Sequence, residues 1–148
     1  MYTEAVILET LRLSSIAPVS VPHAATEDVK FHGYDIPKGT IVFANLYANH
    51  RDPEIWGEDV EEFRPERFLS PDETTVVRHE ALIPFSIGRR VCLGETLARD
   101  TLFLFAANLA QNFEVTVKIG QQEPPLEIKR TLTLAPVSST VAMKERNL

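Results

Sequence analysis

The stretch PFSIGRRVCLG, residues 84–94, contains the only cysteine of this 148-residue chain. Two arginines precede Cys92, and a long helical pattern begins close behind it, at about Leu93. Positive charge and a helix N-terminus both favour the thiolate form of a cysteine, which is the form that attacks substrates or binds metals. Gly88 and Gly94 on either side permit tight turns and the close approach of a flat or bulky group. The stretch therefore predicts an anionic sulfur held in a fixed place.

Three roles are open for Cys92. A lone cysteine is most often a buried structural residue. A cysteine nucleophile would need a histidine partner, and none of the four histidines lies in a recognisable nucleophile motif. A single thiolate can also be an axial metal ligand, and haem iron is the leading case. An internal disulfide and a multi-cysteine zinc or iron–sulfur site are excluded because the chain has one cysteine.

The composition is that of a globular protein, with 44% hydrophobic and 24% charged residues. The net charge of −6 argues against nucleic acid as a partner, because surfaces that bind nucleic acid are basic. No apolar run approaches the roughly 20 residues that a membrane-spanning helix needs, and no secretory leader is visible. A helical pattern starts almost at the first residue without a lead-in, so we expect that the chain is cut from something longer.

Helical spacing, prolines and turn residues divide the chain into six segments. The predicted segments are a helix at 2–13, a strand region at 19–46, a meander at 47–83, the cysteine loop at 84–94, a long helix at 94–112 and short strands at 113–145. Three strands are expected at the end, within 113–120, 126–134 and 138–147, with breaks at Gly120, Pro124–Pro125 and Pro136. We expect all six segments to belong to one domain.

Residues 85–94 match the pattern F-x-x-G-x-R-x-C-x-G through Phe85, Gly88, Arg90, Cys92 and Gly94. The pattern resembles the haem-binding loop of the cytochrome P-450 family, the haem-thiolate monooxygenases. Five fixed positions at ordinary residue usage give a chance match of about one in 10⁴. The resemblance implies the cytochrome P-450 fold, mainly α with small β-sheets, of which this chain would be the C-terminal portion, mixed α and β.

A second pattern supports the same resemblance. Glu9 and Arg12 form E-x-x-R on one face of the first predicted helix, and Arg67 lies in FRPERF. Such a pair is common on exposed helices, where it contributes only about 0.2–0.5 kcal/mol. In the family these three charges form a buried network beneath the haem. The order of the other segments also follows the C-terminal part of the family, so the resemblance covers essentially the whole chain.

The resemblance assigns roles to residues of the cofactor site, which would hold haem, iron protoporphyrin IX. Cys92 resembles the proximal thiolate ligand of the haem iron, and Arg90 resembles a donor to a haem propionate. His23 resembles a second position that reaches a propionate, although an exposed loop histidine would look the same. Phe85 resembles the aromatic residue that shields the sulfur from water. Ala98 is small enough to let the long helix lie close to the porphyrin, next to a loop that includes Gly88 and Gly94.

Two segments resemble the walls of the family's substrate pocket, although a plain buried strand and a plain turn would look similar. The first is IAPVSV, residues 16–21, and the second is the hairpin turn TLTL, residues 131–134. The candidate substrate residues are Ile16, Ala17, Pro18, Val19, Thr131 and Leu132.

The distal helix of the family, with its acid and hydroxyl residues for oxygen activation, has no counterpart in this sequence. We therefore expect the chain to be roughly the C-terminal third of a family member, with the haem between it and an absent portion. On its own, such a fragment is expected to fold poorly, to bind haem weakly and to be inactive.

The resemblance is to the animal microsomal type. It implies electrons from NADPH through a flavin-containing reductase, NADPH-cytochrome P-450 reductase, docking on the proximal face near Arg89. It also implies a small apolar substrate and the cytosolic face of the endoplasmic reticulum membrane, reached only through an N-terminal anchor upstream of this sequence. Two alternatives remain: a haem-thiolate isomerase or dehydratase that does not use O₂, and a truncated non-functional product without haem.

Overall fold

The computed structural model describes residues 1–117 and 128–147, which form a mixed arrangement of helices and small antiparallel sheets. The elements are α1 (Tyr2–Ser14), β1 (His23–Ala24), β2 (Val29–Phe31), β3 (Tyr34–Ile36), β4 (Ile41–Val42), α2 (Leu46–Asn49), α3 (Pro53–Trp56), the 3₁₀ helices η1 (Pro65–Phe68) and η2 (Gly88–Arg90), α4 (Glu95–Asn112), β5 (Phe113–Thr116), β6 (Ile128–Arg130), β7 (Leu134–Pro136) and β8 (Ala142–Glu145).

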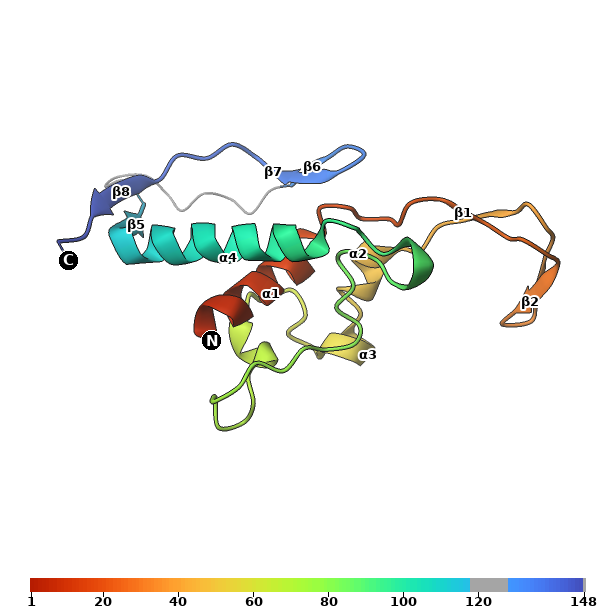
Figure 1. The fold of residues 1–148 in the computed structure, drawn as a ribbon, viewed down its shortest axis with the longest axis horizontal. Helices are drawn as coiled ribbons and strands as arrows, with labels where there is room; N and C mark the ends of the chain where they lie inside the picture. Colours follow the sequence, from red (N-terminus) through yellow and green to blue (C-terminus); the bar gives the residue numbers. More distant parts are fainter. Residues whose placement is uncertain (118–127, 148) are drawn as a thin grey trace.

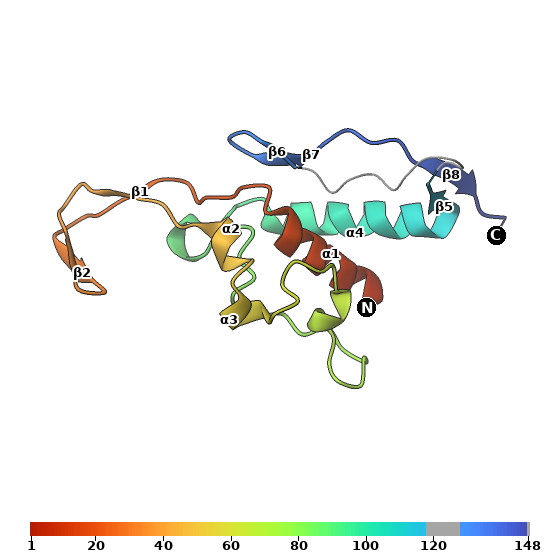
Figure 2. The ribbon, with the colours of Figure 1, turned by 180° about the vertical axis from the view of Figure 1, so that it is seen from behind.

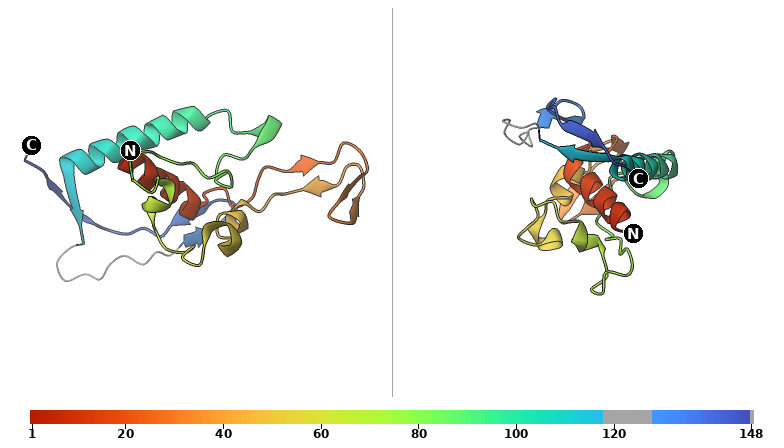
Figure 3. Two further views of the ribbon diagram at one scale, coloured as in Figure 1. Left: turned by 90° about the horizontal axis from the view of Figure 1, so that it is seen from below. Right: turned by 90° about the vertical axis from the view of Figure 1, so that its left-hand side faces the viewer.

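The two long helices, α1 and α4, contact each other near the middle of the molecule. In Figure 1 the β2–β3 hairpin projects at one end and the chain terminates at the other. Figure 2 shows the same arrangement from behind, and the turned views in Figure 3 show α1 beside α4. No helix among the described residues is both long enough and apolar enough to cross a membrane.

Helix α1 forms because its apolar residues recur at helical spacing, and it ends in a left-handed residue. Ala5, Leu8 and Leu11 lie on its buried face. Ser15 has φ 37° and its N–H donates to the Leu11 carbonyl at 3.4 Å, which closes the last turn. Pro18, a few residues later, cannot continue the helix. The helix predicted for residues 2–13 is therefore present, one residue longer at its C-terminal end.

The strands form four separate antiparallel pairs: β1 with β4, β2 with β3, β5 with β8, and β6 with β7. The β2–β3 turn falls at His32 and Gly33, both with positive φ, as the His-Gly pair predicts. The strand predicted over 126–134 is wrong in its extent, because β6 ends at Arg130 and the chain reverses at 131–133. Pro136 is the last residue of β7, opposite Ile128, and non-strand residues follow it, so the predicted break between strands is present there. Residues 118–127, with the predicted breaks at Gly120 and Pro124–Pro125, lie outside the described residues.

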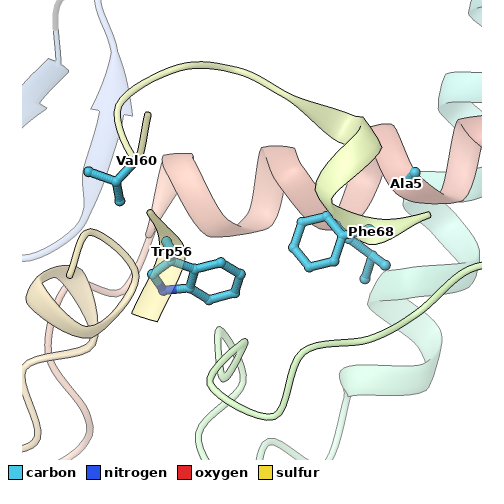
Figure 4. Close-up of a cluster of buried hydrophobic side chains, with 5 residues drawn as sticks. Ala5, Trp56, Val60 and Phe68 are labelled. Carbon is cyan, nitrogen blue, oxygen red and sulfur yellow. The ribbon is translucent and has the colours of Figure 1, made fainter. Parts of the chain in front are cut away.

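The core lies beneath α1 rather than beneath α4. Ala5, Leu8, Trp56, Val60 and Phe68 form the buried cluster, and Figure 4 shows the rings of Trp56 and Phe68 turned toward α1. Their ring centroids are 5.9 Å apart, and the Trp56 indole N–H donates to the Asn49 carbonyl at 2.8 Å. The core therefore joins the first helix to the meander, residues 47–83, that precedes the cysteine loop.

Helix α4 has a different environment, because none of its residues is buried by the described chain. Leu97 and Phe105, on the apolar face of this helix, are 73% and 69% exposed. The helical period was predicted correctly, and the apolar face has no covering element among the described residues.

Replacing Phe68 by Ala should lower the free energy of unfolding by about 3–5 kcal/mol, because the side chain is fully buried and its removal leaves a cavity. Phe63→Ala is the matched control: Phe63 is 53% exposed, and we expect a change of about 0.5 kcal/mol or less. Urea unfolding followed by circular dichroism measures both. Equal losses in the two variants would contradict the placement of the core.

Candidate functional site

Two backbone hydrogen bonds within the cysteine loop, residues 84–94, fix its conformation immediately before α4. The Cys92 N–H donates to the Phe85 carbonyl at 2.9 Å, and the Val91 N–H donates to the Gly88 carbonyl at 3.2 Å. Gly88 has φ 75°, a conformation that favours glycine, and nothing lies within 4 Å of the position a Cβ would take. Gly94 has an ordinary φ of −89° and a Cβ there would meet the Cys92 sulfur at 3.9 Å. The backbone therefore requires glycine at position 88 and not at position 94.

Helix α4 braces the aromatic residue of this loop. The Arg99 guanidinium lies 5.3 Å from the centroid of the Phe85 ring, within cation–π range. The Glu95 carboxylate accepts from Arg99 Nε at 2.8 Å and holds the guanidinium in place. Ala98, half-buried, lies beside Arg99 in the first turns of α4. Our sequence reasoning missed Arg99, although the four-residue spacing of Glu95 and Arg99 on a helix was a usable signal.

A largely apolar cavity of about 420 Å³ opens next to the loop. Its lining residues come from the end of α1, the segment after it, the start of α2 and the cysteine loop: Leu11, Ser14, Ile16, Ala17, Val19, Ser20, Val21, Leu46, Pro84, Phe85, Ser86, Arg90 and Cys92. The structure thus brings three candidate cofactor residues together with three candidate substrate residues. Cys92 itself is exposed.

The other candidate residues are not among those that line the cavity. His23 is exposed in β1, and its Nδ1 lies 2.8 Å from the Val21 carbonyl oxygen. Thr131 and Leu132 form the turn between β6 and β7, with Leu132 exposed. This hairpin is nevertheless tied to the cavity wall, because the Leu134 N–H donates to the Ile16 carbonyl at 2.9 Å. Pro18 lies in the same wall segment, between lining residues.

Glu9, Arg12 and Arg67 form a buried ionic network. Glu9 and Arg12 are 0% exposed, and the carboxylate accepts from Arg12 Nε and Nη2, both at 2.8 Å. The same carboxylate accepts from Arg67 Nε at 3.0 Å and from the Arg64 backbone N–H at 2.9 Å. Burial by itself raises the pKa of Glu9, but the hydrogen bonds from Arg12, Arg64 and Arg67 offset it and lower the pKa overall.

The remaining N–H groups of the two arginines bind backbone carbonyls of the meander. Arg12 donates to the carbonyls of His50 and Glu62, at 2.8 and 3.3 Å. Arg67 donates to the carbonyls of Trp56 and Asp59, at 3.0 and 3.2 Å. The network therefore fixes the path of the chain between α2 and η1, in addition to pairing charges. E-x-x-R spacing and the FRPERF context predicted the ionic pairs but not these carbonyl partners.

His50 is a fully buried residue whose importance the sequence did not reveal. Its Nε2 accepts from the Ile83 backbone N–H at 3.0 Å, and its Nδ1 lies 3.1 Å from Ser15 Oγ. Burial, followed by the nearby charges of Arg12 and Arg51, lowers the pKa of His50 to about 4. The imidazole is therefore neutral at physiological pH.

Comparison with known proteins identifies the family to which the chain is similar. The family model described as Cytochrome P-450 matches residues 1–143. The chain is 44% identical over 145 residues to cytochrome P-450 2U1 of Rattus norvegicus, covering 98% of this chain and 27% of that protein. It is 44% identical over 146 residues to cytochrome P-450 18a1 of Drosophila melanogaster and 43% identical over 146 residues to farnesoate epoxidase of Bombyx mori, covering 99% of this chain and 27% and 29% of those proteins. The chain thus spans less than a third of the length of these relatives.

Replacing Glu9 by Gln should lower the free energy of unfolding by about 3–5 kcal/mol, because the buried Arg12 loses its counter-charge and Arg67 keeps only the more distant Asp59, at 3.6 Å. Glu61→Gln is the control: the exposed Glu61 pairs with Arg51 at 3.3 Å, and such a pair contributes about 0–1 kcal/mol. Urea unfolding at neutral pH compares the two variants. A loss for Glu9→Gln no larger than that for Glu61→Gln would show that the network is not buried.

The free energy of unfolding should fall as the pH is lowered from 6.5 toward about 4, because His50 has a lower pKa when folded than its ordinary 6.5. Protonation then favours the unfolded chain, and the loss across this window approaches about 3 kcal/mol. Glu9 adds a further loss at lower pH, as its depressed pKa is passed. His50→Gln should remove the first of these slopes. Urea unfolding at a series of pH values measures it, and identical slopes in the two proteins would refute the assignment.

Proposed function

Because this chain belongs to the cytochrome P-450 family, we propose that it supplies the thiolate side of the haem pocket in a monooxygenase. The proposed reaction inserts one oxygen atom of O₂ into an apolar organic substrate and reduces the other to water. The observation that carries the proposal is the cavity that Cys92, Phe85 and Arg90 share with Ile16, Ala17 and Val19. One space thus contacts both the candidate iron ligand and the candidate substrate wall.

The lining of the cavity fits a haem group. A porphyrin needs apolar walls for its plane, a ligand for its iron and a cation for its propionates. The exposed Cys92 supplies a thiolate, and Arg90 is the only charged residue among the described residues that line the cavity. Haem bound there supplies O₂ binding and O–O cleavage, which an axial thiolate favours.

The chain's own residues would prepare that site. Phe85, held by Arg99, lines the cavity together with the exposed Cys92 and would shield the sulfur from water once haem covers the loop. The carbonyl of Phe85 also fixes the Cys92 backbone, so the loop does not have to be ordered when haem binds. Arg90 would orient the propionate edge, since a guanidinium binds a carboxylate in a defined plane.

The substrate, the electron source and the location are proposed from the resemblance to the family. One relative is named for epoxidation of farnesoate, and an apolar organic molecule also suits the largely apolar lining of the cavity. We propose that electrons come from NADPH through a flavin-containing reductase that docks near Arg89, and that the protein acts at the endoplasmic reticulum membrane. His23, Pro18, Thr131 and Leu132 remain candidate residues for propionate and substrate contacts in the complete pocket.

Replacing Cys92 by Ala in the haem-loaded enzyme should abolish the red-shifted Soret band of the ferrous carbon monoxide complex, because that band requires a thiolate on the iron. Thr101→Ala is the control; among the described residues, its hydroxyl bonds to the Leu97 carbonyl of the same helix, and its removal should leave the band in place. Difference spectra at equal haem concentration measure both variants. An unchanged band in Cys92→Ala would refute the ligand assignment.

A further inference from the structure

We propose that His50 is a positioning residue that holds the cysteine loop in the geometry required for thiolate ligation, through its hydrogen bond with the Ile83 backbone N–H. This inference rests on the proposed function, because it concerns the ligand loop of that same site. The partners of the His50 imidazole lie 33 and 35 residues away in the sequence, at Ile83 and Ser15.

The hydrogen bonds fix which nitrogen of His50 carries the proton. The Ile83 N–H can only donate, so Nε2 of the imidazole is the acceptor. The Ser15 hydroxyl donates to the Arg12 carbonyl at 2.9 Å, which leaves its oxygen free to accept from Nδ1–H at 3.1 Å. The Ile83 N–H, the imidazole and the Ser15 hydroxyl therefore all form these hydrogen bonds only when the proton of His50 is on Nδ1. A protonated imidazole would lose the acceptor for Ile83, and the low pKa keeps His50 neutral.

Two backbone hydrogen bonds connect the segment at Ile83 to Cys92. The Ile83 carbonyl accepts from the Ser86 N–H at 3.0 Å, closing a turn in which Ser86 has φ 65°, an unfavourable value for a residue other than glycine. Within this turn lies Phe85, whose carbonyl accepts from the Cys92 N–H. A turn with a strained residue needs outside contacts to hold it, and the bond from Ile83 to His50 is such a contact.

On its other side His50 belongs to the buried ionic network. Its carbonyl accepts from Arg12 Nη1 at 2.8 Å. The neighbouring Asn49 donates through Nδ2 to the Ala81 carbonyl at 2.7 Å, a second tie to the segment that leads into the loop. Residues 49 and 50 therefore join the network around Glu9 to the backbone that carries Cys92.

A pair of amide substitutions separates the bond to Ile83 from the rest of the residue. The Gln side chain extends to the region of Nε2 and can accept from the Ile83 N–H, whereas the Asn side chain ends near the position of Nδ1 and cannot. Trp56→Phe is the stability control, because it removes the bond to the Asn49 carbonyl and leaves both bonds of His50 intact. The haem-loaded enzymes are warmed to temperatures below unfolding, and the carbon monoxide complex is measured for loss of the thiolate-bound band.

We expect His50→Asn to show a several-fold larger fraction of the complex without the thiolate than the wild type, and His50→Gln to restore most of the wild-type value. Trp56→Phe should stay close to the wild type although its unfolding temperature falls. Equal fractions in the Asn and Gln variants, or the same fraction in Trp56→Phe as in His50→Asn, would overturn the inference. A wild-type enzyme without the red-shifted band would instead refute the proposed function.

Amide hydrogen exchange on the wild-type enzyme tests the hydrogen bond between the Ile83 N–H and His50 without the need for any variant. The Ile83 amide should exchange much more slowly than the exposed amides of the preceding segment, because it is bonded to a buried imidazole. Exchange at the rate of an exposed loop amide would show that His50 does not hold the loop.

Discussion

The rest of the structure depends on one buried carboxylate. The Glu9 side chain on α1 is fully buried. A buried carboxylate is tolerated only if hydrogen bonds and opposite charges replace its hydration. Two guanidinium groups and one backbone N–H do so, and they come from three places in the chain. The hydrogen bonds of the Glu9 carboxylate therefore require α1 to pack against Arg64 and Arg67 in the segment around η1. This packing positions the meander that precedes the cysteine loop.

The cysteine loop itself has little hydrophobic support within the described chain. Its residues are exposed or half-buried, and α4 behind it has no buried residue. What holds the loop is polar: the bond between the backbones of Phe85 and Cys92, the stacking of Arg99, and the contact of His50 with Ile83. Polar support suits a site that must keep one face open to a large flat cofactor, because hydrogen bonds fix the backbone without filling the space beside it.

The sequence patterns and the resemblance predicted the ionic pairs of Glu9 with Arg12 and Arg67, which the structure shows, whereas the role of the cysteine motif stays a prediction. The residues of the cysteine motif, and the pair Glu9 and Arg12 three positions apart on a helix, could be recognised from the sequence because neighbouring positions determine their geometry. The role of His50 could not, since its partners are brought to it by tertiary structure. Residues 131–134 were predicted as a hairpin turn from the resemblance but as part of a strand from their composition, because a reversal among threonines has no glycine or proline to mark it; the chain does reverse at 131–133.

The arginines of the network bind backbone carbonyl oxygens of the meander, and this limits how the amino-acid sequence of the meander can change. Every residue type carries the same carbonyl, so the side chain at Glu62 can be exchanged without removing an acceptor for Arg12. Asp59 differs, because its carboxylate also pairs with Arg67 at 3.6 Å and with Arg64 at 2.9 Å. An insertion or deletion between α2 and η1 would instead shift all of these oxygens together. The segment is thus constrained in its length as well as at its core residues Trp56 and Val60, and divergence at its exposed positions should proceed by substitution at constant spacing.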